Sequence, residues 1–235
     1  MSSLQNKVAL ITGGSKGIGL GIAQALAAEG VKVAVTSRSQ ASADAGAKAV
    51  SNDALGIEAD VRNRASMDNA VKATADRFGK IDFLIANAGL GHFASIEDLT
   101  DEQWHDTIDT NLTGVFHTIR AGLNELKKSK GYIITISSLA GTNFFPTASA
   151  YNASKFGLTG FTQAVMLDLR HHGINVSTIM PGSVTSHFNG HTPSEDDAWK
   201  IQPEDIGELC VDLFKMNPRA LPSKVEVRPA RPPQK

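Results

Sequence analysis

The chain of 235 residues is 41% hydrophobic and 20% charged, with a formal net charge of −1. This balance is ordinary for a globular protein and gives no electrostatic reason to expect binding to nucleic acid or to an anionic membrane. No apolar run approaches the ~20 residues that cross a bilayer, and the N-terminal run Val8–Ile11 is too short for a signal-peptide core. The single cysteine, Cys210, excludes an internal disulfide and is typical of a reducing compartment, so we expect a cytoplasmic protein.

Short apolar runs alternate with longer helical patterns along the chain. The predicted strands are Val8–Thr12, Val31–Ser37, Leu55–Ala59, Ile81–Asn87, Tyr132–Ser137, Ile174–Met180 and Lys224–Arg228. The predicted helices are Ile18–Glu29, Ser42–Val50, Ala65–Phe78, Asp101–Lys127, Ala150–His171 and Glu204–Lys215. The strands are apolar on both faces, which is typical of parallel strands covered by helices on either side. This alternation predicts an α/β fold of the doubly wound, Rossmann type, with a mostly parallel, seven-stranded sheet. We expect one domain over residues 1–228 and a Pro/Arg-rich tail over residues 229–235.

A glycine-rich turn follows the first strand and leads into the first helix. It reads Thr12-Gly13-Gly14-Ser15-Lys16-Gly17-Ile18-Gly19. Glycines there permit a tight turn and a close approach of backbone N–H groups to a pyrophosphate, and the helix N-terminus adds partial positive charge. Such a turn can also be purely structural, but a strand before it and a helix after it are the context that a dinucleotide site requires. The expected cofactor contacts are Gly13, Ser15, Lys16, Gly17, Ile18 and Gly19.

The end of the second strand predicts which dinucleotide binds. An NAD site usually places a carboxylate there for the ribose 2′-hydroxyl, but this chain has no Asp or Glu between Glu29 and Asp44. Arg38 stands at that point, flanked by Ser37 and Ser39, and a guanidinium is suited to a 2′-phosphate. The alternative is a solvated loop charge. We therefore expect NADP(H).

Five motifs together resemble the short-chain dehydrogenase/reductase family, especially its 3-oxoacyl-carrier-protein reductase type. They are the Thr12–Gly19 turn, Asn87-Ala88-Gly89, Asn111, Ser138 and Tyr151-X3-Lys155, and the resemblance runs from Lys7 to about Met216. It implies that Asn111, Ser138, Tyr151 and Lys155 are catalytic. Tyr151 would be the general acid or base, Ser138 would orient the substrate oxygen, and Lys155 would also hold the nicotinamide ribose. Asn111 would break its helix and let a backbone carbonyl hold a water molecule.

The spacing of Tyr151 and Lys155 has a physical consequence of its own. A free tyrosine has a pKa near 10, and a cation four residues on, at the same helix face, is expected to lower that pKa. Alone, such a pair usually lies on a helix surface, but its place 13 residues after Ser138 favours a site. That spacing also favours Ser138 over its neighbour Ser137. A serine nucleophile is rejected because no motif supplies a His–Asp pair.

The resemblance assigns further contacts. It implies that Asp60 and Val61 lie at the adenine, that Asn87, Ala88 and Gly89 lie at the adenosine ribose, and that Pro181, Gly182, Val184 and Thr185 hold the nicotinamide amide. The substrate is expected to contact Ser138, Tyr151 and four residues of the neighbouring segments: Phe144, Phe145, His187 and Phe188. Other candidates for the pocket wall are Leu90–Phe93, Leu139 and Asn143.

Two features of the pocket differ in what they predict. Its aromatic content favours a bulky apolar aldehyde or ketone. The segment between Thr185 and Pro203 is short and polar where many relatives carry a helical lid, which predicts a more open pocket.

His187 and His191 lie four residues apart, but Gly190 stands between them and no third ligand is ordered beside them, so no metal is expected.

The residues together predict an NADP(H)-dependent oxidoreductase of carbonyl and alcohol substrates, with an aldehyde, a ketone or a 3-oxoacyl thioester as substrate. The alternative is a protein that senses NADP(H) and regulates a partner without turnover, although such a protein has no need of all four catalytic residues. We expect a homodimer or homotetramer. The chain lacks the family's Gly-rich ending, a region that often helps form the tetramer interface.

Overall fold

The structure, a computed structural model, describes residues 3–186, 188–217 and 219–231. The strands are β1 (Val8–Ile11), β2 (Lys32–Ser37), β3 (Leu55–Glu58), β4 (Phe83–Ala86), β5 (Tyr132–Ile136), β6 (Asn175–Pro181) and β7 (Lys224–Val227). The α-helices are α1 (Gly17–Ala28), α2 (Gln40–Val50), α3 (Arg64–Phe78), α4 (Asp101–Ile108), α5 (Gly114–Ser129), α6 (Ser149–Leu169) and α7 (Pro203–Lys215). Every predicted strand is present, with ends that differ by one or two residues.

The seven strands form one sheet in the order β3-β2-β1-β4-β5-β6-β7. Every pairing is parallel, so the sheet is more regular than the mostly parallel one expected. The strands β1, β4 and β5 are buried along their whole length, as their uninterrupted apolar sequences require. The strand order reverses between β1 and β4, and ligands of such sheets bind beyond the carboxyl ends of the strands at this point.

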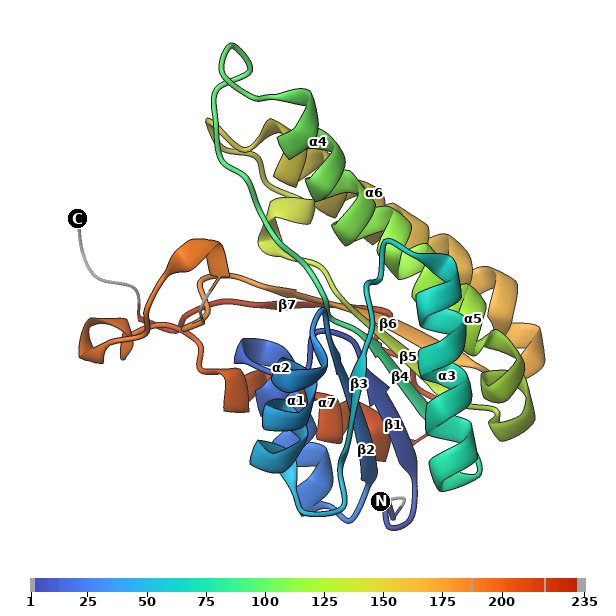
Figure 1. The fold of residues 1–235 in the computed structure, drawn as a ribbon. Coiled ribbons are helices and arrows are strands. Elements are labelled where there is room, and N and C mark those ends of the chain that lie inside the picture. The colour runs from blue at the N-terminus through green and yellow to red at the C-terminus, as the bar shows by residue number, and fades with distance from the viewer. Residues whose placement is uncertain (1–2, 187, 218, 232–235) are drawn as a thin grey trace.

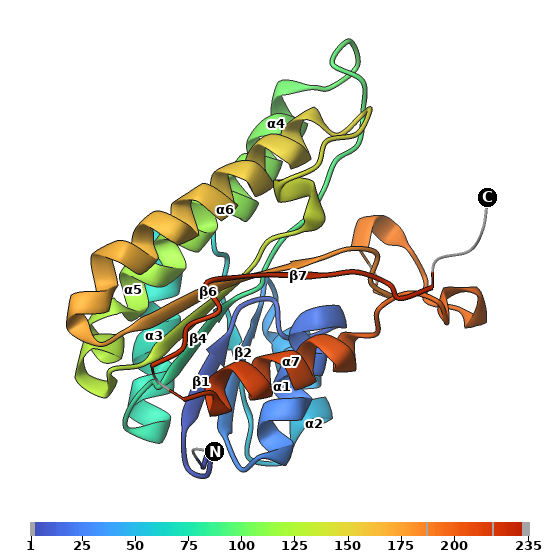
Figure 2. The same ribbon diagram turned by 180° about the vertical axis from the view of Figure 1, so that it is seen from behind.

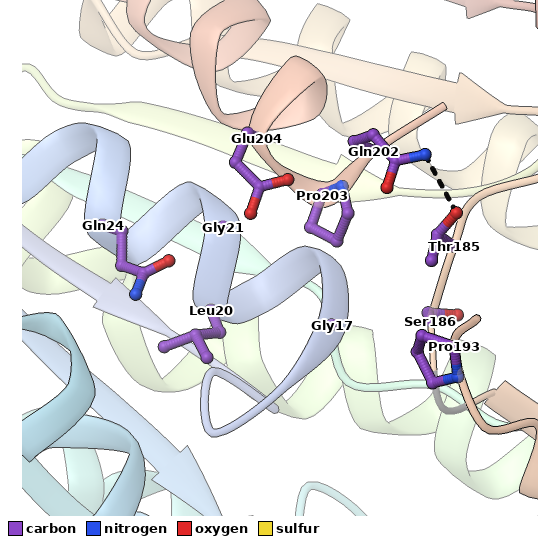
Figure 3. Close-up of a pocket in the computed structure, with 10 residues that line it drawn as sticks. All are labelled: Gly17, Leu20, Gly21, Gln24, Thr185, Ser186, Pro193, Gln202, Pro203 and Glu204. Carbon is purple, nitrogen blue, oxygen red and sulfur yellow. Dashed lines mark hydrogen bonds between the residues drawn. The ribbon is translucent and has the colours of Figure 1, made fainter. Parts of the chain in front are cut away.

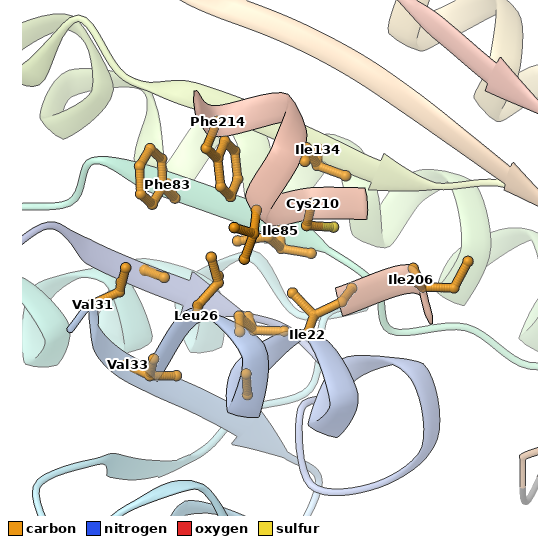
Figure 4. Packing of buried hydrophobic residues seen from close by; sticks show 14 of the residues in the cluster. Ile22, Leu26, Val31, Val33, Phe83, Ile85, Ile134, Ile206, Cys210 and Phe214 are labelled. Carbon is orange, nitrogen blue, oxygen red and sulfur yellow. The ribbon is translucent and has the colours of Figure 1, made fainter. Parts of the chain in front are cut away.

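Helices cover both faces of the sheet (Figures 1 and 2), and a large apolar core lies on each face. The helices α1, α2 and α7 lie on one face, and α3, α5 and α6 lie on the other. In the first core the ring of Phe83 on β4 stacks on that of Phe214 on α7, with centroids 3.9 Å apart (Figure 4). Ile22 and Leu26 of α1 are fully buried beside them, and burial of such a side chain contributes about 1.5–3 kcal/mol. This is the doubly wound, Rossmann-type fold.

The segment predicted as one helix over 101–127 is divided in the structure. A capping box between Thr100 and Gln103 starts α4, and a π-helical segment, Asp109–Thr113, separates α4 from α5. Asn111 lies in the middle of that segment, which agrees with the local break expected there. Single π-helical turns inside α-helices are frequently found at functional sites. Among the helices that the structure describes, none has the length and hydropathy to span a membrane.

Candidate active site

The sequence-predicted site residues converge because the strands that carry them end at the same edge of the sheet. The glycine-rich turn follows β1, Asn87-Ala88-Gly89 follows β4, Ser138 follows β5, and Pro181 ends β6. The strand order places β1, β4, β5 and β6 next to one another. Four segments that are far apart in the sequence therefore meet at the switch point of the sheet.

Tyr151 and Ser138 form the hydroxyl pair of the site. Tyr151 lies in the first turn of α6, and its hydroxyl is close enough to that of Ser138 for the serine to lower the pKa of the phenol. The Ser138 hydroxyl also accepts a hydrogen bond from Ala140 N (3.1 Å), which fixes its direction. The competing serine, Ser137, is buried and hydrogen-bonded to Thr159 (2.9 Å) and to the Lys155 carbonyl (3.2 Å). The structure thus brings Ser138, and not Ser137, to Tyr151.

Lys155 is buried under this pair. Its Nζ donates a hydrogen bond to the Ile136 carbonyl at 3.0 Å and lies 5.7 Å from the centre of the Tyr151 ring. Burial disfavours the charged form and lowers the pKa of Lys155 from 10.5 to about 8. Burial also raises the pKa of Tyr151, and the hydrogen bond from Ser138 opposes that rise only in part. The net fall in the pKa of Tyr151 that the spacing to Lys155 predicts is therefore not found in this structure, because the burial of the phenol dominates.

Asn111 fastens the loop after β4 to α6. Its Nδ2 donates to the Leu90 carbonyl (2.8 Å) and to the Ser154 hydroxyl (3.0 Å), and its Oδ1 accepts from Leu90 N (2.9 Å). The side chain is fully buried. A Cβ at Gly89 would lie 3.2 Å from Asn111 Oδ1 and 3.7 Å from Lys155 Nζ, so the loop passes directly over both residues.

The glycine-rich turn fits a dinucleotide phosphate. A Cβ at Gly13 would lie 3.0 Å from Ala88 Cα, and a Cβ at Gly19 would lie 2.5 Å from Gly13 O. Gly13 and Gly17 have positive φ angles of 62° and 55°, which favour glycine. Lys16 is the N-cap residue of α1, and among the described residues its side chain forms no hydrogen bond with the N–H groups at the start of that helix. These N–H groups therefore stay available to an anion.

Asn87 ties this turn to β4. Its Nδ2 donates to Thr12 O (2.9 Å) and to Gly13 O (3.1 Å). Ser15 lies against α2, since a Cβ at Gly46 would come within 2.5 Å of Ser15 Cα. The side chain of Ile18 packs against the first core. These contacts give three of the predicted cofactor residues a structural role in holding the turn.

Arg38 is exposed just beyond the end of β2, where the 2′-substituent of the adenosine ribose was expected. It takes part in none of the ion pairs between described residues. Asp60 is bound by Arg62, at 2.6 Å between Asp60 Oδ2 and Arg62 Nη2. That contact, more than the distant charge of Arg38, lowers the pKa of Asp60. The guanidinium of Arg38 therefore remains available to a phosphate.

The segment after β6 is held by its own polar contacts. The Thr185 hydroxyl donates to the Asp197 carbonyl (3.2 Å) and accepts from Gln202 Nε2 (3.1 Å). Lys200 and His191 both bind the Asp197 carboxylate, so the pKa of Asp197 is held far below its usual value. The imidazole of His191 is thus hydrogen-bonded to the Asp197 carboxylate. His187 lies outside the described residues.

A cavity of about 240 Å³ lies between this segment and the starts of α1 and α7 (Figure 3). Gly17, Thr185 and Ser186 line it together with Pro203. Because Tyr151 and Ser138 are absent from its wall, this cavity is not the place where a substrate would meet the hydroxyl pair.

Aromatic rings cover Tyr151. Phe93 lies 5.4 Å and Phe188 lies 5.6 Å from Tyr151 between ring centroids, and Phe145 lies 6.1 Å from Phe93. The predicted open pocket is therefore closed over Tyr151 on this side. The structure does not bring Phe144 to this cluster, because 85% of its side chain is exposed.

Some contacts that hold the site carry no sequence signal, although Leu90 and Asn143 were expected at the pocket wall. Ser154 and Leu90 hold Asn111, and Asn152 donates from Nδ2 to Ala140 O and Asn143 O (both 2.8 Å), which fixes the loop before α6. The partners of Asn111 lie 21 and 43 residues away in the sequence. Only the chemistry of a buried amide, which must be hydrogen-bonded, could have indicated that such partners exist.

The comparison with family models and known proteins agrees with this geometry. A model described as short chain dehydrogenase matches residues 7–197. A putative ketoacyl reductase of the monensin polyketide synthase of Streptomyces virginiae is 42% identical over 190 residues, which cover 78% of this chain and 73% of that protein.

Two solved structures share the fold over almost the whole chain. An alcohol dehydrogenase from Thermococcus sibiricus, complexed with 5-hydroxy-NADP, has a TM-score of 0.90. A 3-ketoacyl-(acyl-carrier-protein) reductase from Brucella melitensis, complexed with NADH, has a TM-score of 0.89. Each is 28% identical, and each alignment covers 97% of this chain and 99% of the other. The two cofactors differ, so these relatives support a nicotinamide cofactor without selecting its phosphorylated form.

Proposed function

The chain belongs to the short chain dehydrogenase family, and we propose that it is an NADP(H)-dependent oxidoreductase of aldehydes or ketones and the matching alcohols. The names of several relatives describe enzymes that act on CH–OH or C=O groups. The observation that carries the proposal is the meeting of the Tyr151 and Ser138 side chains with the buried Lys155, whose Nζ lies 5.7 Å from the centre of the Tyr151 ring. A 3-oxoacyl thioester is a further substrate of the same chemistry. The binding protein without turnover remains the alternative, and no observation on the structure favours it.

The proposed mechanism uses the two hydroxyls in different ways. The carbonyl carbon would receive a hydride from NADPH, which is the chemistry that the cofactor supplies when bound. The Ser138 hydroxyl donates a hydrogen bond to the carbonyl oxygen and holds it in place, while Tyr151 transfers its proton to that oxygen. In the direction of oxidation, the deprotonated Tyr151 accepts the proton of the alcohol.

Lys155 supports the proton transfer of Tyr151. A protonated Lys155 one turn away stabilises the phenolate that Tyr151 becomes, and solvent then returns the proton. Lys155 would also hold the nicotinamide ribose. Asn111 keeps the loop after β4 over this pair, and the water held by a backbone carbonyl in the π-helical segment stays a prediction.

The preference for NADP(H) rests on Arg38. Its exposed guanidinium has no ion-pair partner among the described residues, and Ser37 and Ser39 flank it. The nearest carboxylate on the adjoining strand, Glu58, accepts a hydrogen bond from Gln40 N at 2.9 Å, so it is engaged at the start of α2. A guanidinium in this place favours a 2′-phosphate.

The other proposed cofactor contacts follow the edge of the sheet. They are Gly13, Ser15, Lys16, Gly17, Ile18 and Gly19 for the pyrophosphate, Asp60, Val61, Asn87, Ala88 and Gly89 for the adenosine, and Pro181, Gly182, Val184 and Thr185 for the nicotinamide amide. For the substrate we propose Ser138, Tyr151, Phe145 and Phe188.

We further propose that residues 1–228 act as one domain, followed by the tail over 229–235, and that the protein is cytoplasmic and forms a homodimer or homotetramer. Large apolar side chains are exposed on α4, α5 and α6, which lie side by side (Figures 1 and 2). They include Trp104, Phe116, Phe156 and Leu167, which are 37–50% exposed. Burial of these side chains between copies would remove an apolar surface from water. Light scattering on the purified protein measures the oligomeric state directly.

The test of the proposed activity is the consumption of NADPH, followed at its absorbance band, with a panel of aldehydes, ketones, diketones and 3-oxoacyl thioesters. Turnover with NADPH, and much slower turnover with NADH, is expected. Tight NADPH binding without turnover of any member of the panel would contradict the proposal and favour the binding protein.

A further inference from the structure

Three aromatic rings from three separate segments meet at the reactive end of the site. Phe93 belongs to the loop after β4, Tyr151 to α6, and Phe188 to the segment after β6. Their ring centroids lie 5.4 Å (Phe93–Tyr151), 5.6 Å (Tyr151–Phe188) and 6.2 Å (Phe93–Phe188) apart. The interplanar angles of 57–67° are the tilted and edge-on arrangements that aromatic pairs prefer.

The backbone leaves room for this cluster at one point. A Cβ at Gly91 would lie 2.8 Å from Phe188 Cζ and 3.0 Å from Phe93 Cζ. A side chain at position 91 would therefore push the two rings apart. The contact between Phe93 and Phe188 depends on glycine at this position, which makes the cluster a built feature of the loop.

The outer faces of the rings remain open to a ligand. Phe93 is 37% and Phe188 is 36% exposed, although both touch Tyr151. The wall that they form is apolar and uncharged, with the two rings edge to face, and it stands beside the ring of Tyr151. Such a wall favours a planar aromatic group over a flexible alkyl chain, because two tilted rings gain an electrostatic attraction that saturated carbon does not.

We propose that the substrate is an aryl ketone or aryl aldehyde, and this inference rests on the proposed function. The ring of the substrate packs against Phe93 and Phe188 while its carbonyl oxygen reaches Tyr151 and Ser138. The present centroid distances leave no room for another ring between Tyr151 and Phe188, so one of the covering rings moves aside. We assign this movement to Phe188, which lies two residues before Gly190, where φ is 74° and no atom lies within 4 Å of the place of a Cβ.

The test compares two ketones that differ in the ring alone. Acetophenone and cyclohexyl methyl ketone carry the same carbon skeleton, one with a flat aromatic ring and the other with a puckered saturated ring. The quantity measured is the ratio of their kcat/KM values with NADPH, taken for the wild type and for each variant. Comparison of the ratio between variants cancels the different intrinsic reactivity of the two carbonyl groups.

Phe93→Leu and Phe188→Leu are each expected to lower the ratio about threefold to tenfold, as the loss of one aromatic pair implies. Phe93→Tyr, which keeps the ring, is expected to retain the wild-type ratio. Phe144→Leu is the matched control, since Phe144 is largely exposed, and its ratio should equal that of the wild type. An unchanged ratio in both leucine variants would overturn the proposal, as would an equal fall in Phe144→Leu.

A binding measurement separates this proposal from the proposed function. If no carbonyl compound is turned over, the proposed function fails, and the ring preference is then measured by the affinity of the NADPH-loaded protein for the two ketones, using ligand-observed NMR. Tighter binding of acetophenone that is lost in Phe93→Leu supports the aromatic site. Equal affinities for the two ketones overturn it. Circular dichroism and retained NADPH binding show that each variant is folded.

Discussion

Lys155 Nζ lies 5.7 Å from the centre of the Tyr151 ring, one turn further along α6, and its hydrogen bond is to the carbonyl oxygen of Ile136. Burial acts on both side chains and favours the uncharged form of each. The pKa of Lys155 falls to about 8, and that of Tyr151 rises. The charge on Lys155 is thus close to its midpoint at mildly alkaline pH, which makes its protonation a sensitive control on the phenol beside it.

The first prediction concerns the two tyrosines. Tyr151→Phe should lower kcat about 10²- to 10⁴-fold, the usual contribution of a general acid, while the Kd for NADPH changes little. Tyr132→Phe is the matched control, because the Tyr132 hydroxyl is buried in the core and bonded to Ser177 Oγ at 2.8 Å. That variant should lose about 1 kcal/mol of stability and keep its kcat. Steady-state kinetics, fluorescence titration with NADPH and urea unfolding measure these quantities; comparable turnover in Tyr151→Phe would rule out the mechanism.

The second prediction concerns the pH dependence of stability from Lys155. Its folded-state pKa lies below its unfolded value, so the unfolded chain binds more protons between about pH 8 and 10.5, and stability rises with pH in that window. At about 1.4 kcal/mol per unit of pKa, the fall from 10.5 to about 8 corresponds to roughly 3 kcal/mol. Lys155→Met lacks this titration. The stability difference between variant and wild type should therefore shift by up to that amount, in favour of the wild type, as the pH rises.

Urea unfolding of both proteins at pH 7 and pH 10, without added nucleotide, measures that shift. Other titrating groups are common to the two proteins and cancel. Lys155→Met should also lose turnover at both pH values. A stability difference that is the same at the two pH values would show that burial does not lower the pKa of Lys155.

The third prediction tests the choice of cofactor. Arg38→Asp should weaken NADPH binding about 10- to 100-fold, because a charged hydrogen-bonding partner of the phosphate is lost, and should change NADH binding far less. Arg77→Asp makes the same change of charge at the far end of α3 and should leave both affinities as they are. The Kd values for NADPH and NADH are measured by fluorescence titration. An unaltered preference in Arg38→Asp would mean that another residue holds the phosphate.

The fourth prediction concerns two glycines. Gly19→Ala would place a Cβ 2.5 Å from both Gly13 O and Asn87 Nδ2, so the turn must shift, and we expect loss of nucleotide binding together with a lower melting temperature. Gly160→Ala is the control inside α6, where a Cβ would meet no atom within 4 Å. It should raise stability by about 0.5–1 kcal/mol, the helix preference for alanine. A melting temperature for Gly19→Ala equal to that of the wild type would contradict the crowding at this position.

The sequence by itself determined the order of strands and helices, the glycine-rich turn and the positions of Ser138, Tyr151 and Lys155. These depend on local patterns: apolar runs, glycine at a strand end, and fixed spacing along a helix. The parallel sheet followed from the alternation, because strands joined by crossover helices run the same way. The helix predicted over 101–127 differs from the structure, because the π-helical segment around Asn111 divides it and is stabilised by distant partners.

Only the tertiary structure decided the chemistry around those residues. The pKa of Tyr151 rises where the spacing to Lys155 alone predicted a fall, because burial is created by elements that no local pattern describes. In the same way Leu90 and Ser154 reach Asn111, and Phe93 and Phe188 reach Tyr151, from separate strand ends. Desolvation and ring packing depend on which surfaces the fold brings together, and that is settled only when the whole sheet has formed.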